Sequence, residues 1–275
     1  NVRPRIARML GHDKFEFEWI SLYKFQCRRM DNFVHDRVIF AGDAAHQVSP
    51  FGARGANSGL EDAENLAWKL DRVLRRTSPA GLLERYHVER STAADENIRE
   101  STRSTDFMAP NSKPEERLRK AVLALAKETE FGKRMVNGGR LSVPTMYESP
   151  LSTPDGDHWL GGPRPGTSMP DAPIVVTEGR ISFLTDAFIT QGSRFTLLEF
   201  GHGDGNGIGA GEGRGLIRIG GDDGLTDSEG LASARYDAEP GTAYLLRPDG
   251  YVAARFRKPT RAAIDAALAR ASGIN

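Results

Sequence analysis

The sequence predicts an α/β fold divided between two units, and three observations support this. A short apolar run, 37–42, leads into a long segment with helical periodicity. A stretch rich in glycine, proline and serine, 137–173, then interrupts the chain. Beyond it, apolar runs with strand character are followed by one amphipathic segment. A chain of 275 residues has room for two hydrophobic cores.

The composition argues against several classes of binding partner. With 37 basic and 37 acidic residues the formal net charge is zero, so nothing favours a nucleic-acid or anionic-membrane partner. No apolar run approaches the ~20 residues that a membrane span needs. Cys27 is the single cysteine, which excludes an internal disulfide, a Cys-x-x-Cys pair and a cysteine-rich metal site. Low cysteine content is typical of the cytoplasm, where we expect the protein to reside.

The first elements are expected to be strands. In the run FEFEWISLYKFQC, 15–27, aromatic residues at first alternate with glutamates, which predicts a half-buried strand of an antiparallel sheet. We expect Phe15, Trp19 and Tyr23 to pack in the core, with an aromatic substrate as the alternative contact. Cys27 is expected to be a small core residue. The continuous apolar run RVIFAG, 37–42, predicts a buried strand.

Three helices are expected next. In the segment that begins at Asn57, one helical stripe is formed by Leu60, Ala63, Ala67, Leu70 and Leu74. Acidic residues crowd the first turns of this segment and arginines its last turn, as the helix dipole favours. A second helix is expected over 79–108. A third is expected over 114–136, with Pro114 at its start, where a missing N–H costs little.

The C-terminal unit is predicted from short apolar runs. Strands are expected at 194–200, 215–220, 241–248 and 251–256. Asp249-Gly250 is expected to be the turn of a hairpin between the last two strands. An amphipathic helix, 260–272, closes the unit, and the glycine-rich segment 201–215 is expected to be mobile.

A carboxylate, Asp43, directly follows the apolar run 37–42. We expect it at the carboxyl end of a parallel strand, where open α/β sheets bind ligands. It can accept two hydroxyl hydrogen bonds, which suits the ribityl chain or ribose of a nucleotide cofactor. Pro50 and Gly52 then shape a turn that lets the backbone approach a flat ligand. A Gly-Asp pair alone usually marks a turn and nothing more. The cofactor site is therefore predicted from the whole pattern, which is a strand, the sequence GDAAH, a proline, glycines and then a helix.

The helix after this turn opens with Gly55, Ala56 and Asn57. Their N–H groups have no partner within the helix, and the helix dipole favours negative charge in front of them. A reduced flavin carries its negative charge around N1 and the C2 carbonyl. A helix start aimed at that part of a flavin would therefore stabilise its reduced, anionic form.

Other polar residues near this run are expected to have structural roles. His46 is interpreted as a packing or capping residue rather than a catalyst. Arg54 is interpreted as a solvated loop arginine, although it could reach an anionic substrate or NADPH. No second histidine or carboxylate stands at metal-ligand spacing from His46, so no metal site is expected. No side chain is predicted to be a catalytic acid or base.

Two regions resemble one family of enzymes. The run GDAAHQVSPFGARGANSGLEDAENLAWKL, 42–70, resembles the second flavin-binding motif of the class A flavoprotein aromatic hydroxylases. LLERYHVER, 82–90, resembles the segment that follows this motif. PGTSMPDAPIV, 165–175, and YLLRPDGYVAARF, 244–256, are similar to the C-terminal region of the phenol-hydroxylase-like branch, which includes 3-hydroxyphenylpropionate hydroxylases.

The resemblance implies a division of the chain into three parts. Residues 1–136 would be the C-terminal part of an FAD-binding (GR2-type) domain, with the end of the substrate sheet. Residues 137–173 would be a connector. Residues 174–275 would be a thioredoxin-like α/β domain without redox cysteines.

The resemblance also implies roles for the candidate residues. Asp43 would bind the ribityl chain of FAD. Pro50, with Gly52 in the same turn, would line the flavin. The backbone of residues 55–57 would contact the flavin ring. The implied activity is hydroxylation of a phenolic or related aromatic small molecule with FAD, NAD(P)H and O₂.

One departure from the family bears on this reading. The Gly-x-Gly-x-x-Gly unit that begins family members is not found, and the glycines of 203–207 lie far from an N-terminal strand, turn and helix. The chain therefore resembles the C-terminal half of a hydroxylase, with a separate N-terminal FAD-binding segment as its partner. Alone it is expected to be inactive, and a homodimer is a possible assembly. Alternatives are a non-catalytic fragment or subunit that completes an FAD site only with the other half, or a related flavoprotein epoxidase, halogenase or reductase.

Overall fold

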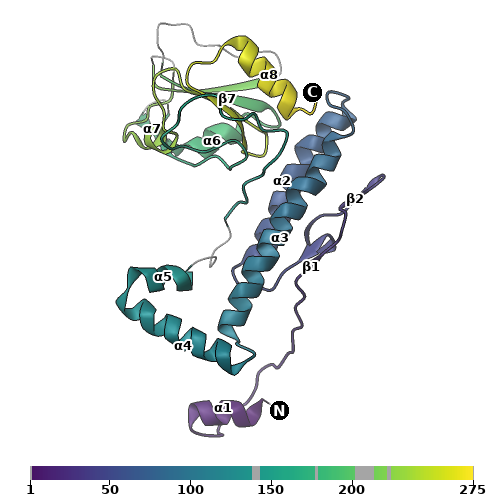
Figure 1. The fold of residues 1–275 in the computed structure, drawn as a ribbon, viewed down its shortest axis with the longest axis vertical. Coiled ribbons are helices and arrows are strands. Elements are labelled where there is room, and N and C mark those ends of the chain that lie inside the picture. Colours follow the sequence, from purple (N-terminus) through teal and green to yellow (C-terminus); the bar gives the residue numbers. More distant parts are fainter. Residues whose placement is uncertain (1, 138–142, 177–178, 202–213, 222–223, 275) are drawn as a thin grey trace.

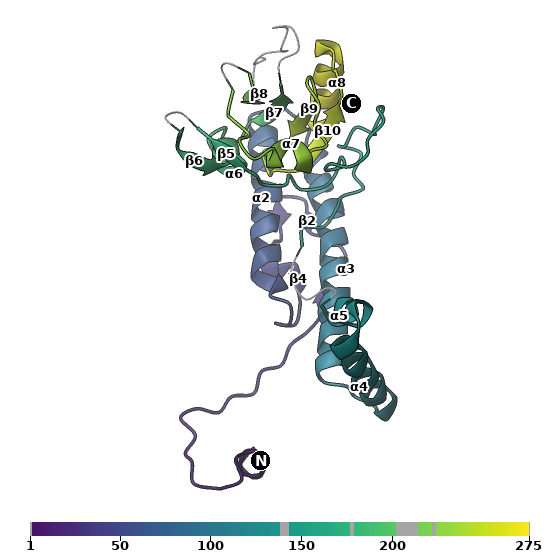
Figure 2. The same cartoon turned by 90° about the vertical axis from the view of Figure 1, so that its left-hand side faces the viewer.

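Two long helices form the axis of the molecule. The computed structural model describes residues 2–137, 143–176, 179–201, 214–221 and 224–274. Helices α2 (Arg54–Leu74) and α3 (Leu82–Met108) lie side by side. The C-terminal sheet unit sits at one end of this pair and a short helical arm at the other (Figures 1 and 2). None of the helices in the described part of the chain is both long and apolar enough to cross a membrane.

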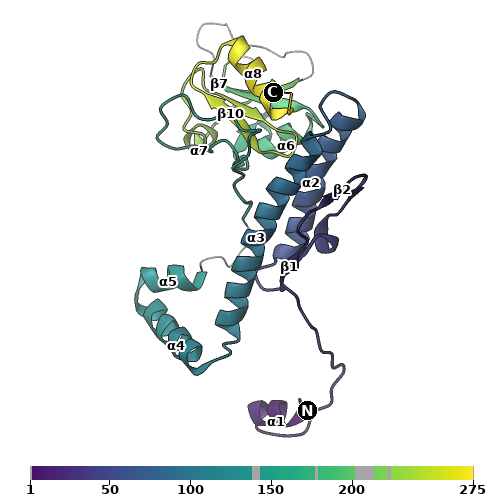
Figure 3. The same ribbon diagram turned by 45° about the vertical axis from the view of Figure 1, so that its right-hand side comes forward.

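The N-terminal elements are short. They are α1 (Arg3–Leu10), β1 (Arg28–Arg29), β2 (Val34–His35), β3 (Val38–Ile39), the 3₁₀ helix η1 (Gly42–Ala44) and β4 (His46–Gln47). β1 pairs with β4 and β2 pairs with β3, both antiparallel. These pairs lie against the α2–α3 pair, while α1 is held away from it at the end of an extended segment (Figure 3).

The strand expected over 15–27 is not formed. In the described structure this segment is irregular and exposed, with Trp19 71% and Leu22 85% accessible, and Cys27 is exposed rather than in the core. The predicted core packing of Trp19 and Tyr23 is therefore wrong. A strand needs a neighbour to pair with its N–H and C=O groups, and no described strand lies beside this one. Its rings contact each other instead, as Trp19 and Tyr23 do at 6.0 Å.

The strand expected over 37–42 is present only in part. β3 pairs with β2 in a tight antiparallel hairpin, with Val34 opposite Ile39. Asp43 therefore does not follow a strand of a parallel sheet among the described residues. It lies in η1, in a turn between two antiparallel pairs.

Helix α2 is formed as predicted, but it buries the opposite face. Leu60 and Leu74, members of the apolar stripe, are 65% and 72% exposed. The buried positions are polar for the most part: Arg54, Ser58, Asp62, Asn65, Trp68 and Lys69. Buried charge is tolerated only when it is paired, so this face depends on partners supplied by α3 and by the C-terminal unit.

The single helix expected over 114–136 is a hairpin of two helices. α4 (Lys113–Glu128) begins with a capping box between Ser112 and Glu115, next to Pro114 in the first turn. The chain turns at Thr129, whose backbone is extended, and α5 (Glu130–Asn137) folds back on α4. The contact is close at Gly132, where a Cβ atom would lie 2.5 Å from the backbone of Ala126. Periodicity alone does not reveal such a break.

The C-terminal unit contains a mixed sheet. Its elements are β5 (Pro173–Val175), β6 (Ile181–Phe183), α6 (Leu184–Ile189), β7 (Phe195–Phe200), β8 (Arg214–Ile219), α7 (Leu231–Arg235), β9 (Ala243–Leu246), β10 (Val252–Phe256) and α8 (Arg261–Ala271). The strand order is β10-β9-β7-β8, with β7 and β8 parallel and the other pairs antiparallel. All four predicted strands, the β9–β10 hairpin with its turn at Gly250 (φ 74°) and the closing helix are confirmed.

Two earlier expectations fall partly on residues outside the described ranges. Most of the glycine-rich segment 201–215, expected to be mobile, belongs to 202–213. Part of the connector expected over 137–173 belongs to 138–142. The described part of that connector, from residue 143, crosses from the α5 side of the molecule to the C-terminal unit (Figure 1).

A buried network of charges joins the C-terminal unit to the helix pair. Arg247, in the β9–β10 turn, donates two hydrogen bonds to Glu89 of α3, at 2.8 and 3.0 Å. Lys69 of α2 donates to the same carboxylate at 2.7 Å. Asp249 accepts from Arg247 at 2.5 Å and from the Trp68 indole at 2.9 Å. The four charged side chains are at most 1% exposed, so two positive charges face two negative charges away from water.

The pKa of the central carboxylate reflects this arrangement. Burial alone would raise the pKa of Glu89, but the charges of Arg247 and Lys69 and their hydrogen bonds outweigh burial and lower it. Folding therefore stabilises the ionised carboxylate.

We predict that this network makes the chain sensitive to acid. Because the pKa of Glu89 is lower in the folded state than its ordinary value of 4.5, the unfolded chain takes up a proton at a higher pH than the folded chain. Stability should be fully present above that ordinary value and should fall as the pH drops below it. Urea unfolding measured from about pH 6 to about pH 3 tests this. Glu89→Gln should show a weaker pH dependence over this range, and an equal dependence in both proteins would contradict the assignment.

Candidate functional site

The turn that carries Asp43 is held at its backbone. The N–H of Gly42 donates to Asp62 Oδ2 on α2 at 2.7 Å. Gly42 has a left-handed backbone (φ 56°) and lies against Gly59 of α2, where a Cβ atom would be 3.7 Å from the Gly42 Cα. Asp43 itself is exposed, and its carboxylate makes no hydrogen bond or ion pair with any described residue. The turn is therefore anchored on one side and presents a free acceptor on the other.

Asp62 is the anchor. Its carboxylate is fully buried and has three donors: the Gly42 N–H, His46 Nε2 at 2.7 Å and Arg90 Nε at 2.5 Å. Burial would raise the pKa of Asp62, but the hydrogen bond from His46 and the charge of Arg90 outweigh burial and lower it. An ionised carboxylate thus links η1, β4, α2 and α3.

Arg90 fills the space between α2 and α3. Its guanidinium donates to the Ser58 carbonyl and hydroxyl at 2.9 and 3.0 Å, and to Glu61 at 2.9 Å. It also donates to the hydroxyl of Tyr147 at 2.5 Å. Because every arm of the guanidinium is used, the arginine fixes the position of the Asp62 carboxylate.

The loop between β4 and α2 is fastened to α3. Ser49 Oγ lies 2.5 Å from the Ser101 hydroxyl and 2.8 Å from the Thr105 hydroxyl. Arg54, at the start of α2, donates to Asn97 at 2.9 Å. The loop ends with Gly52 and Ala53 at φ values of 93° and 52°, a sharp reversal that aims the chain into the helix.

The first turn of α2 offers backbone donors. The N–H groups of Gly55 and Ala56 fall where no preceding carbonyl of the helix can accept from them. The side-chain amide of Asn57 donates to the Ala53 carbonyl at 2.7 Å. The described residues of this segment thus offer an exposed carboxylate at Asp43 and first-turn amides without an acceptor in the helix. They match the hydroxyls of a ribityl chain and the electron-rich edge of a flavin ring, so the residues present fit FAD.

Comparison with known families decides what this segment is. The family described as FAD binding domain matches residues 2–101, and the family described as aromatic-ring hydroxylase, C-terminal, matches residues 162–274. The two matches follow each other along most of the chain, in the order that the sequence predicts.

The chain belongs to the FAD-dependent aromatic hydroxylases.

Individual relatives agree with this assignment. The chain is 28% identical over 254 residues to the 12-dehydrotetracycline 5-monooxygenase/anhydrotetracycline 6-monooxygenase of Streptomyces rimosus, covering 92% of this chain and 46% of the relative. It is 45% identical over 89 residues to a probable NADH-specific resorcinol 4-hydroxylase of Rhodococcus jostii, covering 32% of this chain and 17% of the relative. The chain thus spans about half the length of the monooxygenase that it matches over most of its residues.

A solved hydroxylase has the same fold over nearly the whole chain. The flavin-dependent monooxygenase PieE, determined with FAD and substrate, superposes with a TM-score of 0.72 at 25% sequence identity. The match covers 98% of this chain and 54% of PieE. The α/β fold described above is therefore similar to that part of a solved flavin-dependent monooxygenase.

In this segment one prediction agrees with the structure, one needs correction, and one class of residue was not predicted. His46 has the structural role expected, because it is buried and bonded to Asp62. Arg54, expected to be a solvated loop residue, is only 4% exposed and pairs with α3. Asp62 and Arg90 were treated only as parts of helical patterns. Asp62 lies on the face of α2 opposite the apolar stripe, and three of its helical neighbours are small or polar: Ser58, Gly59 and Asn65. No comparable signal in the sequence marks Arg90.

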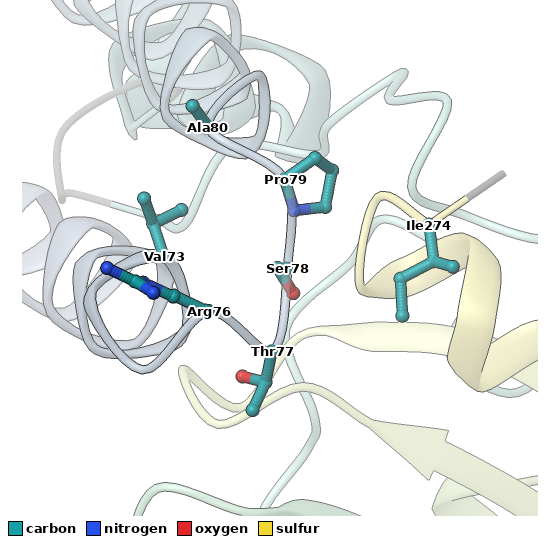
Figure 4. A pocket seen from close by; sticks show the side chains of 7 residues that line it. All are labelled: Val73, Arg76, Thr77, Ser78, Pro79, Ala80 and Ile274. Atoms are coloured by element: carbon teal, nitrogen blue, oxygen red, sulfur yellow. The ribbon is translucent and has the colours of Figure 1, made fainter.

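Two clefts near the helix pair lie at different distances from the candidate flavin loop. A cleft of about 1010 Å³ is lined by Phe51 and Gly52 of the candidate flavin loop, by the C-terminal half of α3 and by α4 and α5. A smaller one, about 440 Å³, lies at the turn between α2 and α3 (Figure 4). That turn is at the far end of α2, roughly 30 Å from the first helical turn by helix rise. Only the larger cleft adjoins the flavin loop.

We predict that Asp62→Asn strongly destabilises the hydroxylase chain. The change leaves Arg90 buried with one counter-charge fewer, which costs about 3–5 kcal/mol in free energy of unfolding. Asp95→Asn is the matched control, since Asp95 pairs with Arg29 at 2.7 Å but is 55% exposed. That change should cost about 0–1 kcal/mol. Urea unfolding of both variants measures the difference, and similar small losses would show that the Asp62 pairing does not anchor the turn.

Proposed function

We propose that this chain forms the flavin-facing and C-terminal part of an FAD-dependent monooxygenase that hydroxylates an aromatic ring with NAD(P)H and O₂. The observation that carries the proposal is the anchored turn, in which the Asp43 carboxylate is exposed and makes no hydrogen bond or ion pair with a described residue. The monooxygenase names of the relatives support the reaction class.

Different residues of this segment hold different parts of FAD. Asp43 accepts hydrogen bonds from the ribityl hydroxyls. Pro50, which is exposed, and Gly52, which is half-buried, bring the loop against the flavin. The amides of Gly55 and Ala56, with Asn57 behind them, face the electron-rich edge of the ring, where the α2 dipole favours negative charge.

Bound FAD, reduced by NAD(P)H, would activate O₂, so that one oxygen atom of O₂ enters the aromatic ring and the other leaves as water. The protein residues position the cofactor and exclude water. The name of the resorcinol hydroxylase relative favours NADH over NADPH as the reductant. No described side chain is assigned as a catalytic acid or base.

We propose that a segment upstream of this chain completes the FAD site and the substrate sheet. Residues 1–136 then form the end of the FAD-binding domain and residues 137–173 a connector. Residues 174–275 form a thioredoxin-like domain without redox cysteines. The mixed β10-β9-β7-β8 sheet supports the fold, and the range contains no cysteine. Without the upstream segment the chain would be the non-catalytic half of such an enzyme.

We further propose that the cleft beside Phe51 receives the aromatic substrate. Its lining is largely apolar, with Phe51, Phe107, Met108, Leu118, Val122, Met135 and Val136. Arg99 and Arg103 also line it, one helical turn apart on α3. Neither arginine makes a hydrogen bond or an ion pair with another described residue. A volume of about 1010 Å³ at this position suits a large aromatic molecule with an acidic or phenolate group.

We predict that Asp43→Ala weakens FAD binding. In the protein with its upstream region, loss of charge-assisted hydrogen bonds to the ribityl chain should raise the Kd for FAD about tenfold or more. Flavin fluorescence titration measures the Kd. Asp71→Ala, which removes a half-buried carboxylate paired with Arg75 near the far end of α2, should leave the Kd unchanged. A wild-type Kd for the Asp43 variant would rule out its role.

We predict that replacing both Arg99 and Arg103 by alanine weakens binding of aromatic anions. The residues that line the cleft in this structure all belong to this chain, so the 275-residue protein is the test object. Titration with 1-hydroxy-2-naphthoate should show an affinity loss of about tenfold, while uncharged 1-naphthol should bind with unchanged affinity. Equal affinity of the anion for both proteins would mean that the arginines do not face a ligand.

A further inference from the structure

The connector residue Tyr147 lies between the flavin turn and the C-terminal unit. Its side chain is 2% exposed, and its hydroxyl accepts a hydrogen bond from Arg90 at 2.5 Å. Arg90 in turn donates to Asp62 at 2.5 Å, and Asp62 accepts the Gly42 N–H at 2.7 Å. Three successive hydrogen bonds thus connect the Tyr147 hydroxyl, through Arg90 and Asp62, to the backbone of the turn that carries Asp43.

Tyr147 is itself fixed by the C-terminal unit. Its ring stacks on Tyr251, with centroids 4.5 Å apart and planes at 22°. Its backbone N–H donates to the Gly166 carbonyl at 2.8 Å, and the Gly166 N–H donates to the Val252 carbonyl at 2.8 Å. A Cβ atom at Gly166 would lie 2.1 Å from the Tyr147 carbonyl oxygen, so only glycine fits at this contact.

Helix α3 carries both connections on consecutive residues. Glu89 binds Arg247 of the β9–β10 turn through two hydrogen bonds, and Arg90 binds Asp62 and Tyr147. Successive helical residues point about 100° apart, so one site on α3 faces the C-terminal unit and the flavin turn at once. A shift of the β9–β10 hairpin would therefore be transmitted through Glu89 to Arg90, the next residue on α3.

We propose that Tyr147 is a positioning residue, through which the C-terminal unit restrains the Gly42–Asp43 turn. The C-terminal unit thereby acts on the flavin site, although it contributes no residue to the proposed flavin contacts. The restraint is a property of this chain without cofactor. It becomes relevant to FAD only through the proposed role of Asp43.

Hydrogen–deuterium exchange of the 275-residue chain tests the proposal. Tyr147→Phe removes the hydroxyl but keeps the ring that stacks on Tyr251. Peptides containing Gly42 should then exchange about tenfold faster, because local opening of the turn loses a hydrogen bond to a charged group. Exchange in β7 and β9 should stay unchanged.

Tyr236→Phe is the matched control. Tyr236 is also fully buried, and its hydroxyl donates to the Pro170 carbonyl at 2.8 Å within the C-terminal unit, away from Arg90. Exchange at Gly42 in this variant should equal the wild type. The proposal is overturned if Tyr147→Phe leaves Gly42 exchange unchanged, if it accelerates exchange throughout the chain to the same extent, or if Tyr236→Phe accelerates Gly42 exchange equally. None of these outcomes depends on flavin binding.

Discussion

The ionised carboxylate of Asp62 is the contact on which the candidate flavin site depends. It is buried, and it accepts from a backbone N–H in the turn, from a histidine on β4 and from an arginine on α3. Because Gly42 is held on its inner side, the neighbouring Asp43 points to solvent with its acceptors free. Asp62 thus sets the position of the surface carboxylate of Asp43, which lies nineteen positions earlier in the chain. Asp62 itself does not need to contact a ligand.

Holding a turn with buried charges has a high cost in desolvation free energy. Apolar side chains of equal volume would cost less desolvation, and such replacements often stabilise proteins. Here the charges fix directions that apolar contacts cannot. Arg90 has a separate partner for each arm, and Arg247 binds Glu89 through a two-point contact in a fixed orientation. We infer that this directionality, rather than added stability, is the reason why the interior between α2, α3 and the C-terminal unit is polar.

Much of the fold was predictable because it depends on local rules. Helices α2 and α3, the strands after residue 194 and the turn at Asp249-Gly250 follow from periodicity and turn chemistry. The failures share one cause, which is that pairing and burial depend on distant residues. Alternation over 15–27 predicts a strand only where a neighbour exists, and the Leu60–Leu74 stripe predicts a core face only where apolar partners cover it. The candidate flavin residues were found by motif, whereas Asp62 and Arg90 emerge only when two helices are brought together.

A crystal structure of the protein with FAD bound tests the central claim most directly. The account predicts that the Asp43 carboxylate lies within hydrogen-bonding distance of the ribityl hydroxyls while the Gly42 N–H remains on Asp62. A flavin bound away from this turn, or a Gly42 amide turned from Asp62 to the cofactor, would contradict it.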